Sequence, residues 1–446
     1  MRVSRPLLVV VALLFAPQPF TAAAEFPLKV AANGRYLVDQ TGDPFLVVGD
    51  TAWSLIVQLD NDDIDRYLSD RQKRGINSII VNLIEHKFCA NAPKNRAGLA
   101  PFQRIGDFST PNPDYFDFAH EVIKKAHEKG IVVWLFPAYL GWGGKDEGFF
   151  REMKSSGKAS LRGYGRFLGS RFKDLPNIVW VMGGDYTPEP EDQWTVNEIA
   201  EGIRKEDPTH PMSGHGSPEH AAVAAFGDQD WLAINAVYSY QKTLFQPAFA
   251  EYQRRPHRPF LLIESTYEGE HDSTPDQIRR QAYWAMLSGA CGQFFGNNPI
   301  WHFDGPGLYS VKTTWQEALS GTGSRDMSRL RDLFIGLPWH RLEPDSNHEI
   351  LSEGYGDGIT TALTARTADK RLSLTYIPST GTDSRALTVD LAQFSGPITA
   401  RFYNPATGQW IAMTGEPLPN RGRHSLHTPG DNGTGTNDWI LALEVR

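Results

Sequence analysis

The feature that most constrains the fold is a repeated alternation of short apolar segments with helical patterns. Eight apolar segments of strand length occur between residues 45 and 295. They are continuously apolar, which is typical of parallel strands that are buried on both faces. The eight segments are Phe45–Val48, Ser78–Leu83, Ile131–Phe136, Ile178–Met182, Met212–Gly214, Leu232–Val237, Phe260–Ile263 and Gly292–Phe295.

Amphipathic helical patterns separate most of these segments. The best-marked start is at Thr274, where Pro275 at the first helical position and Gln277 complete a capping pattern. Eight strand–helix units over about 300 residues predict an α/β fold of the (β/α)8 TIM barrel type. A doubly wound open sheet is the alternative, although the chain has no glycine-rich phosphate motif. The other predicted helices are Asp63–Arg74, Asp114–Lys129, Leu161–Phe172 and Val196–Arg204.

Both ends of the chain differ from this pattern. Residues 1–24 combine Arg2 and Arg5, an apolar stretch and a run of three alanines, which indicates a secretory signal peptide and a secreted or periplasmic protein. Residues 25–341 would form the barrel, with a short hairpin before it. From residue 342 to 446 the helical period disappears, and short alternating segments between turn clusters predict a small antiparallel β-sandwich.

The composition excludes several classes of partner. With 44 basic and 52 acidic side chains the net charge is −8, and no long basic run is present, which argues against nucleic acid. No later apolar stretch reaches about 18 residues, so a membrane span is not expected. No cofactor motif and no metal spacing stand out, and we expect neither; Glu85, His86 and His215 are the alternative metal ligands. The oligomeric state stays open.

Two acidic residues follow buried segments directly. Asp185 comes after two glycines at the end of the fourth segment, and Glu264 ends the seventh. Asp185 could instead cap a turn, but a Glu in a buried strand is disfavoured unless it is paired or used. Carboxyls at the ends of the fourth and seventh barrel strands approach one another across the barrel mouth. Glycosidic cleavage needs such a pair, so Asp185 and Glu264 are the predicted catalytic residues.

Polar and aromatic side chains follow the other predicted strands. Planar rings suit the C–H faces of sugars, and amides or carboxylates suit their hydroxyls. Each residue alone has an ordinary structural interpretation: Asp50 as a helix cap, Trp53 as core, His215 as a buried histidine. Their shared position at one rim predicts a substrate-binding site made of Asp50, Trp53, Asn82, Trp142, His215, Tyr238, Tyr267, Asn297 and Trp301.

These motifs resemble a known family. The segments Gly49–Trp53, Arg74–Asn77, Asn177–Asp185 and Glu264–Glu268, with Ala282–Trp284, are similar to the apiosidase-like catalytic domain that defines glycoside hydrolase family 140. The stretches 402–408 and 437–439 are similar to the small β-domain that usually follows it, which carries a collagen-binding label.

The resemblance implies a retaining glycosidase. Asp185 would be its general acid/base and Glu264 its nucleophile, and the substrate would be a plant-type polysaccharide or glycoside that carries terminal apiose or a related furanose. Two alternatives stay open. One is a glycosidase for another sugar, such as an arabinofuranosidase, a galactosidase or an endo-glucanase. The other is a non-catalytic carbohydrate- or matrix-binding protein.

Overall fold

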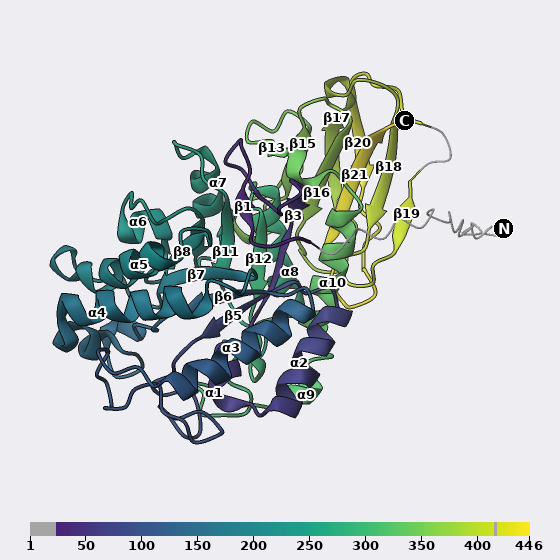
Figure 1. Cartoon of the computed structure of the whole chain (residues 1–446). Coiled ribbons are helices and arrows are strands. Elements are labelled where there is room, and N and C mark those ends of the chain that lie inside the picture. Colours follow the sequence, from purple (N-terminus) through teal and green to yellow (C-terminus); the bar gives the residue numbers. More distant parts are fainter. Residues whose placement is uncertain (1–23, 414–416) are drawn as a thin grey trace, which may run out of the picture.

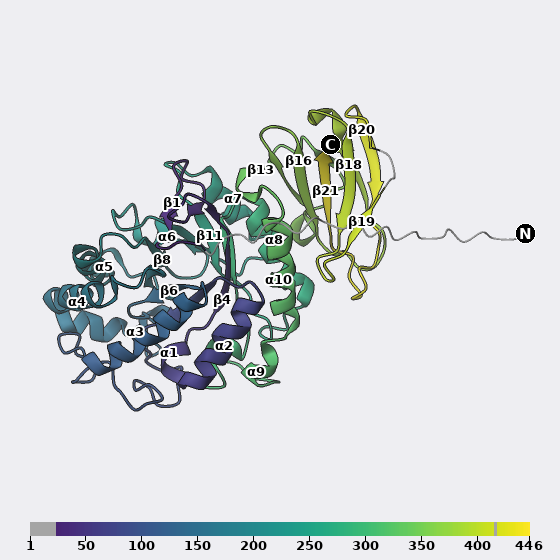
Figure 2. The same ribbon diagram turned by 45° about the vertical axis from the view of Figure 1, so that its right-hand side comes forward.

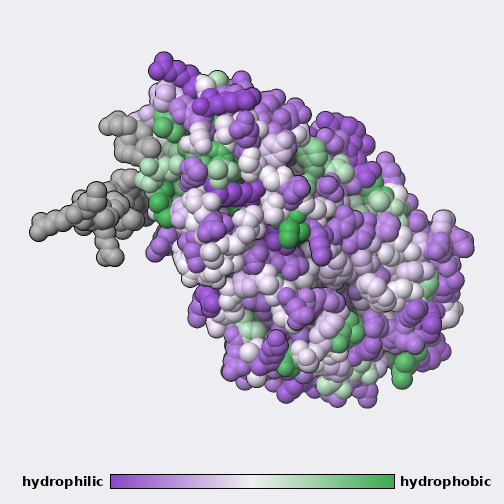
Figure 3. Space-filling view, turned by 180° about the vertical axis from the view of Figure 1, so that it is seen from behind, coloured by the Kyte–Doolittle hydropathy of each residue, from purple (hydrophilic) through white to green (hydrophobic). Residues whose placement is uncertain are grey.

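The computed structural model describes residues 24–413 and 417–446. The predicted signal peptide, residues 1–24, therefore lies outside the described residues except for Ala24. The chain has a mixed α/β part, followed by antiparallel sheets that pack against one side of it (Figures 1 and 2). In the described residues no helix has the length and apolarity needed to cross a membrane. The face seen from behind is mostly hydrophilic, with hydrophobic residues in small groups (Figure 3).

A nearly closed, mostly parallel sheet of nine strands forms the centre of the first part. Its order is β8-β7-β6-β5-β4-β12-β11-β10-β9, in which β9 alone is antiparallel to its neighbour. A single parallel bridge between Ser213 and Ile234 links β8 to the segment before β10 and brings the two sides of the sheet together. The strands are β4 (Val47–Thr51), β5 (Ser78–Asn82), β6 (Val132–Phe136), β7 (Ile178–Gly183), β8 (Met212–His215), β9 (His220–Ala221), β10 (Asn235–Tyr238), β11 (Phe260–Glu264) and β12 (Gly292–Phe295).

Helices alternate with these strands and surround the sheet (Figure 1). The predicted strand–helix alternation is confirmed. The eight parallel strands correspond to the eight apolar segments, and the antiparallel strand β9 is additional. The helices are α1 (Leu55–Gln58), α2 (Asn61–Lys73), α3 (Pro113–Glu128), α4 (Phe150–Phe172), α5 (Trp194–Glu206), α6 (Ala222–Phe226), α7 (Phe245–Gln253), α8 (Pro275–Leu287), α9 (Trp315–Ala318) and α10 (Thr322–Ile335). Cys89 and Cys291 are buried and unpaired.

The first apolar segment, predicted as one strand, is divided in the structure. Its beginning belongs to β3 (Pro44–Phe45), which pairs antiparallel with β2 (Leu37–Val38) in a small sheet with β1 (Lys29–Val30). The chain then changes partner, and β4 pairs in parallel with β5 and β12. One apolar segment thus supplies two sheets, which hydrophobicity alone cannot reveal.

Two antiparallel sheets make up the chain after residue 341. The larger has the order β13-β15-β16-β21-β18-β19 and the smaller β14-β17-β20. Residues of both sheets, including Leu387 and Leu426 of the smaller and Phe402 and Leu441 of the larger, share one apolar core. The strands are β13 (Leu342–Pro344), β14 (Leu351–Glu353), β15 (Leu363–Thr367), β16 (Leu372–Ile377), β17 (Ala386–Asp390), β18 (Ile398–Tyr403), β19 (Trp410–Ala412), β20 (Arg423–His427) and β21 (Trp439–Val445).

Helix α8 joins the two parts. Its Tyr283 ring stacks on Tyr376 of β16 with centroids 4.9 Å apart, and its Trp284 indole N–H donates to the carbonyl of Thr361 at 2.9 Å. The guanidinium of Arg279, also on α8, is buried. Its Nε donates to Oδ2 of Asp438 at 2.7 Å and its Nη2 to Oδ1 at 2.8 Å. The interface thus combines an apolar core with a buried, bidentate ion pair.

Candidate active site

The turn after β7 holds Asp185 in an uncommon conformation. Gly183 and Gly184 have φ of +101° and +120°, and Asp185 has φ of +55°. A Cβ on Gly183 would meet the carbonyl oxygen of His215 at 2.3 Å, and one on Gly184 would meet the Tyr139 ring at 2.4 Å. Only glycine fits these two positions, because both backbone angle and space exclude a side chain. Left-handed backbone at a non-glycine residue such as Asp185 is often found at functional sites.

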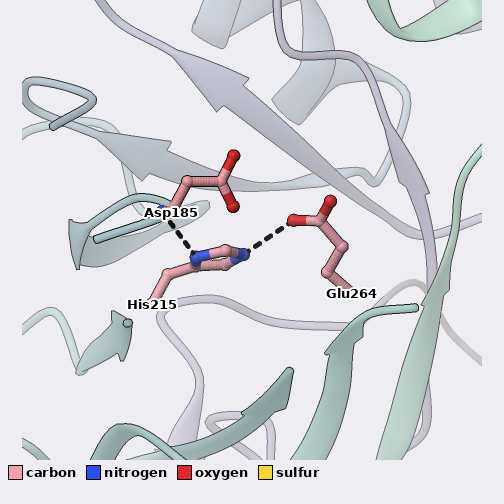
Figure 4. A group of neighbouring side chains, drawn as sticks. All are labelled: Asp185, His215 and Glu264. Carbon is pink, nitrogen blue, oxygen red and sulfur yellow. Dashed lines mark hydrogen bonds and ion pairs between the residues drawn. The ribbon is translucent and has the colours of Figure 1, made fainter. Parts of the chain in front are cut away.

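Asp185 and Glu264 meet around a shared histidine (Figure 4). Glu264 ends β11, and His215 ends β8. Nε2 of His215 lies 2.8 Å from Oε2 of Glu264, and the backbone N–H of Asp185 faces Nδ1 of the same ring at 3.3 Å. One carboxylate oxygen of Asp185 and one of Glu264 lie within 4.8 Å of each other. Two acids that are 79 residues apart in the sequence therefore face each other (264 − 185 = 79).

The hydrogen bonds identify the tautomer of His215. An amide N–H can only donate, so Nδ1 accepts the proton of the Asp185 backbone. Nε2 then carries the ring proton and donates it to Oε2 of Glu264. Tyr240 Oη donates to the other oxygen of Glu264 at 3.3 Å, and Tyr139 Oη donates to Oδ2 of Asp185 at 2.6 Å. Each carboxyl group is thus oriented by its own neighbours.

Burial and mutual charge shift the ionisation of this group. Burial raises the pKa of Glu264, the Asp185 charge raises it further, and the His215 hydrogen bond opposes both. Burial lowers the pKa of His215, but the hydrogen bond and charge of Glu264 outweigh this effect and raise the pKa overall. A carboxyl group in a cavity whose pKa is raised by burial and by a neighbouring charge, as for Glu264, is typical of acid–base chemistry.

Both acids line one cavity of about 660 Å³. Aromatic rings form much of its wall, and Trp142 at its mouth is 52% exposed. Of the residues predicted to bind substrate, six line this cavity: Trp53, Asn82, Trp142, Tyr238, Tyr267 and Trp301. His215 is buried and does not line it, but contacts both acids.

Two predicted substrate-binding residues lie elsewhere. Asp50 is buried and bonded to Nη1 of Arg71 at 3.1 Å and to Tyr67 Oη at 2.8 Å, so its carboxylate serves an ion pair with helix α2 and not the cavity. Asn297 donates to Oε2 of Glu268 at 2.8 Å and does not line the cavity either. Asp50 lies within β4 and Asn297 follows β12, and both side chains contact the surrounding helices and loops instead of the cavity.

Several lining residues were not predicted, above all Glu270 and Tyr309. They lie in the loops after β11 and β12, where no strand or helix pattern predicts the direction in which a side chain points. A signal was present for Glu270, because Glu264, Glu268 and Glu270 form a short acidic stretch after a buried strand. Glu268 itself lies outside the cavity lining, where it accepts the backbone N–H of Gly323 at 2.9 Å.

The same three residues could be considered as metal ligands, since Asp185, His215 and Glu264 each offer a ligand atom within 4.8 Å of the others. However, Nε2 of His215 and Oε2 of Glu264 are 2.8 Å apart, whereas two ligands on one tetrahedral zinc ion are more than about 3 Å apart. The arrangement is that of a histidine hydrogen-bonded to Glu264, with the Asp185 carboxylate close by. The alternative grouping with Glu85 and His86 is not assembled, because His86 pairs with Glu152 at 3.0 Å and Oε1 of Glu85 accepts the amides of its own loop.

A parallel barrel-like sheet with two carboxyl groups facing each other in an aromatic-lined cavity defines a glycoside hydrolase-like protein. The family model described as "Apiosidase-like, catalytic domain" matches residues 31–341. The chain belongs to this apiosidase-like family. A second model, described as "Putative collagen-binding domain of a collagenase", matches residues 347–444.

Solved structures share this fold over almost the whole chain. One described as "Glycoside hydrolase" is 24% identical, with a TM-score of 0.80, and the match covers 94% of this chain and 96% of the other. A glycoside hydrolase family 5 protein from Bacteroides vulgatus ATCC 8482 is also 24% identical, with a TM-score of 0.81 and coverage of 94% and 93%. No curated protein sequence matches the chain. Family membership and fold together support a glycoside hydrolase-like function.

Proposed function

We propose that this protein is a retaining glycoside hydrolase of family 140 that releases apiose or a related furanose from a plant-type polysaccharide or glycoside. The observation that carries the proposal is the approach of the Asp185 and Glu264 carboxylates to within 4.8 Å in one cavity. Retaining enzymes place these groups about 5–5.5 Å apart, and inverting enzymes about 6.5–9.5 Å. The nearest oxygens are thus closer to the retaining range than to the inverting range, which supports a direct attack by one carboxylate.

In the proposed mechanism Glu264 attacks the anomeric carbon. Asp185 protonates the departing oxygen and then takes a proton from the water that hydrolyses the glycosyl-enzyme. His215 holds Oε2 of Glu264 and Tyr240 contacts Oε1, so the nucleophile keeps one orientation. We further propose that the sheet is a variant of the (β/α)8 barrel and that residues 1–24 direct the protein to the periplasm or the exterior.

Hydrolysis of a panel of 4-nitrophenyl glycosides, beginning with the apioside and other furanosides, tests the function. NMR of the first product formed shows whether the anomeric configuration is kept. Release of nitrophenol with retention is the expected result. Inversion would contradict the mechanism, and lack of turnover on every glycoside, with sugar binding intact, would favour a non-catalytic binding protein.

Replacing Asp185 with Ala should slow hydrolysis strongly, and added azide should restore the rate. Without the side chain no group activates water, but a small anion needs no base to attack the glycosyl-enzyme. We expect azide to accelerate the variant by about 10-fold or more on a substrate with a nitrophenolate leaving group. The product should be a glycosyl azide of the same anomeric configuration as the substrate. Wild-type enzyme is the control, and absence of the azide product would contradict the assignment of Asp185.

Replacing His215 with Phe should move the acid limb of kcat/KM to higher pH. The His215 hydrogen bond lowers the pKa of Glu264, so its loss raises that pKa further. Glu264 must be ionised to attack, and the ionised fraction falls as pH drops through the pKa. A hydrogen bond to a charged group is worth about 1.5–3 kcal/mol, which corresponds to a shift of about 1–2 pH units. His424→Phe on β20 is the control, and an unchanged acid limb would contradict the role of His215.

A further inference from the structure

The cavity contains a third carboxyl group that the acid pair does not use. Glu270 lies in the loop between β11 and α8, is 8% exposed and lines the same cavity as Asp185 and Glu264. Its Oε1 accepts the indole N–H of Trp301 at 2.9 Å. Trp301 in turn packs edge-on against Phe88, with ring centroids 5.1 Å apart. One oxygen of Glu270 is thus fixed by the wall of the cavity.

The second oxygen of Glu270 has no donor among the described residues. An ionised carboxylate can accept about four hydrogen bonds, so most of its capacity is unused. Two other acceptors in the cavity share this condition: Oδ1 of Asn82 and Oδ1 of Asp185 are buried without a partner. Asn82 cannot turn its amide around freely, because its Nδ2 donates to Glu85 at 2.9 Å. The cavity therefore presents acceptors that suit a ligand with several hydroxyl groups.

The charge of the cavity is uneven. Its carboxyl groups are Asp185, Glu264, Glu270 and Glu147, of which Glu147 forms an ion pair with Lys87 at 2.9 Å. The lining residues that can carry a positive charge are Lys242 and His271, and both are exposed. The buried part is thus acidic, and an anionic sugar placed there would face like charges in a poorly hydrated site.

We propose that Glu270 is a specificity-determining residue, which accepts a hydrogen bond from a hydroxyl of the bound sugar and, with Asp185 and Glu264, restricts the buried site to neutral sugars. The inference deepens the proposed function, on which it rests only in taking the ligand to be a sugar. Burial, together with the charge of Glu264, raises the pKa of Glu270 to about 7, although the Trp301 bond opposes the rise. Binding is therefore measured at pH 8, where Glu270 is mostly ionised.

Calorimetry with 4-nitrophenyl thioglycosides, which resist hydrolysis, tests this proposal. The probes are a set of neutral pentosides and hexosides and the glucuronide. Wild-type protein should bind the best neutral thioglycoside at least 10-fold more tightly than the glucuronide. Glu270→Gln keeps an oxygen for Trp301 but loses one acceptor and one charge. It should bind the neutral probe at least 10-fold more weakly than wild type, and the glucuronide no more weakly.

Two further variants separate the hydroxyl contact from the charge and from the fold. Glu270→Asp keeps the charge but shortens the side chain, so it should lose affinity for the neutral probe and still reject the glucuronide. Glu191→Gln, the same chemical change at an exposed position outside the cavity lining, should leave both affinities unchanged. Thermal denaturation of each variant shows that it is folded.

The results overturn the proposal in three cases. In the first, wild-type protein binds no neutral thioglycoside. In the second, it binds the glucuronide as tightly as the best neutral thioglycoside. In the third, Glu270→Gln binds all probes with the same affinity as wild type. Failure of the proposed function is a separate result. If the protein binds the neutral probes but cleaves none of the corresponding O-glycosides, the hydrolase is contradicted and the role of Glu270 in binding stands. Cleavage with unaltered binding by Glu270→Gln contradicts the role of Glu270 alone.

Discussion

Replacing Glu264 with Gln is expected to lower glycoside hydrolysis by about 10⁴-fold or more, because loss of a catalytic nucleophile removes the covalent pathway. The amide is nearly the same size as the carboxylate and still offers an oxygen to Nε2 of His215, 2.8 Å away in the native protein. The fold should therefore persist, as circular dichroism and thermal denaturation would show. The readout is kcat/KM on the best aryl glycoside.

Glu121→Gln on helix α3 is a matched control, since Glu121 is exposed and outside the cavity lining, and it should keep full activity. Azide should not restore the Glu264→Gln variant in the way expected for Asp185→Ala, because there is no glycosyl-enzyme for it to attack. A Glu264→Gln enzyme that keeps more than about 1% of the wild-type rate would contradict the assignment of the nucleophile.

Replacing Asp438 with Ala is expected to lower the free energy of unfolding by about 3–5 kcal/mol. Asp438 and Arg279 are both almost completely buried, and their two short hydrogen bonds join the residue directly before β21 to α8. Removal of the carboxylate leaves the guanidinium buried with Asp326, 3.0 Å away, as its main remaining partner. The free energy that is needed to remove the guanidinium from water is then no longer offset by its interaction with Asp438.

Urea denaturation measures this loss. The control is Asp369→Ala, which breaks an exposed ion pair with Arg341 at 2.6 Å and should cost less than about 1 kcal/mol. Because the buried pair crosses between the two parts of the chain, wild-type protein should unfold in a single transition. A loss below about 1 kcal/mol for Asp438→Ala would contradict the structural importance of this contact.

The position of the strands and of the two acids could be predicted from the sequence, for physical reasons. Continuous apolar segments have few places in a folded chain other than the centre of a parallel sheet. Two glycines before Asp185 indicate an unusual backbone conformation, and a Glu at the end of the buried strand β11 is a charged residue where apolar ones are usual. The structure brings both acids to one cavity, as the strand-end argument predicts.

Other features could not be predicted because they depend on distant partners. The sequence predicts that Asp50 lies beyond the end of a strand, as Asp185 does, but β4 extends to Thr51, and Arg71 and Tyr67 of helix α2 bind the Asp50 carboxylate. Glu270 enters the cavity from a loop whose path depends on Trp301, 31 residues further along the chain. No local pattern records either of these contacts.

Helix α8 also connects Glu264, the proposed nucleophile, to the C-terminal sheets. Gln281 on this helix donates to the backbone carbonyl of Thr266 at 2.7 Å and accepts from Ser265 Oγ at 3.0 Å, and Ser265 directly follows Glu264. One turn away, Tyr283 and Trp284 are covered by residues beyond 341. A chain shortened at that point would expose two aromatic rings to water and loosen the helix that supports the proposed nucleophile. Engineering that removes the last hundred residues as a separate accessory would thus disturb the proposed catalytic site itself.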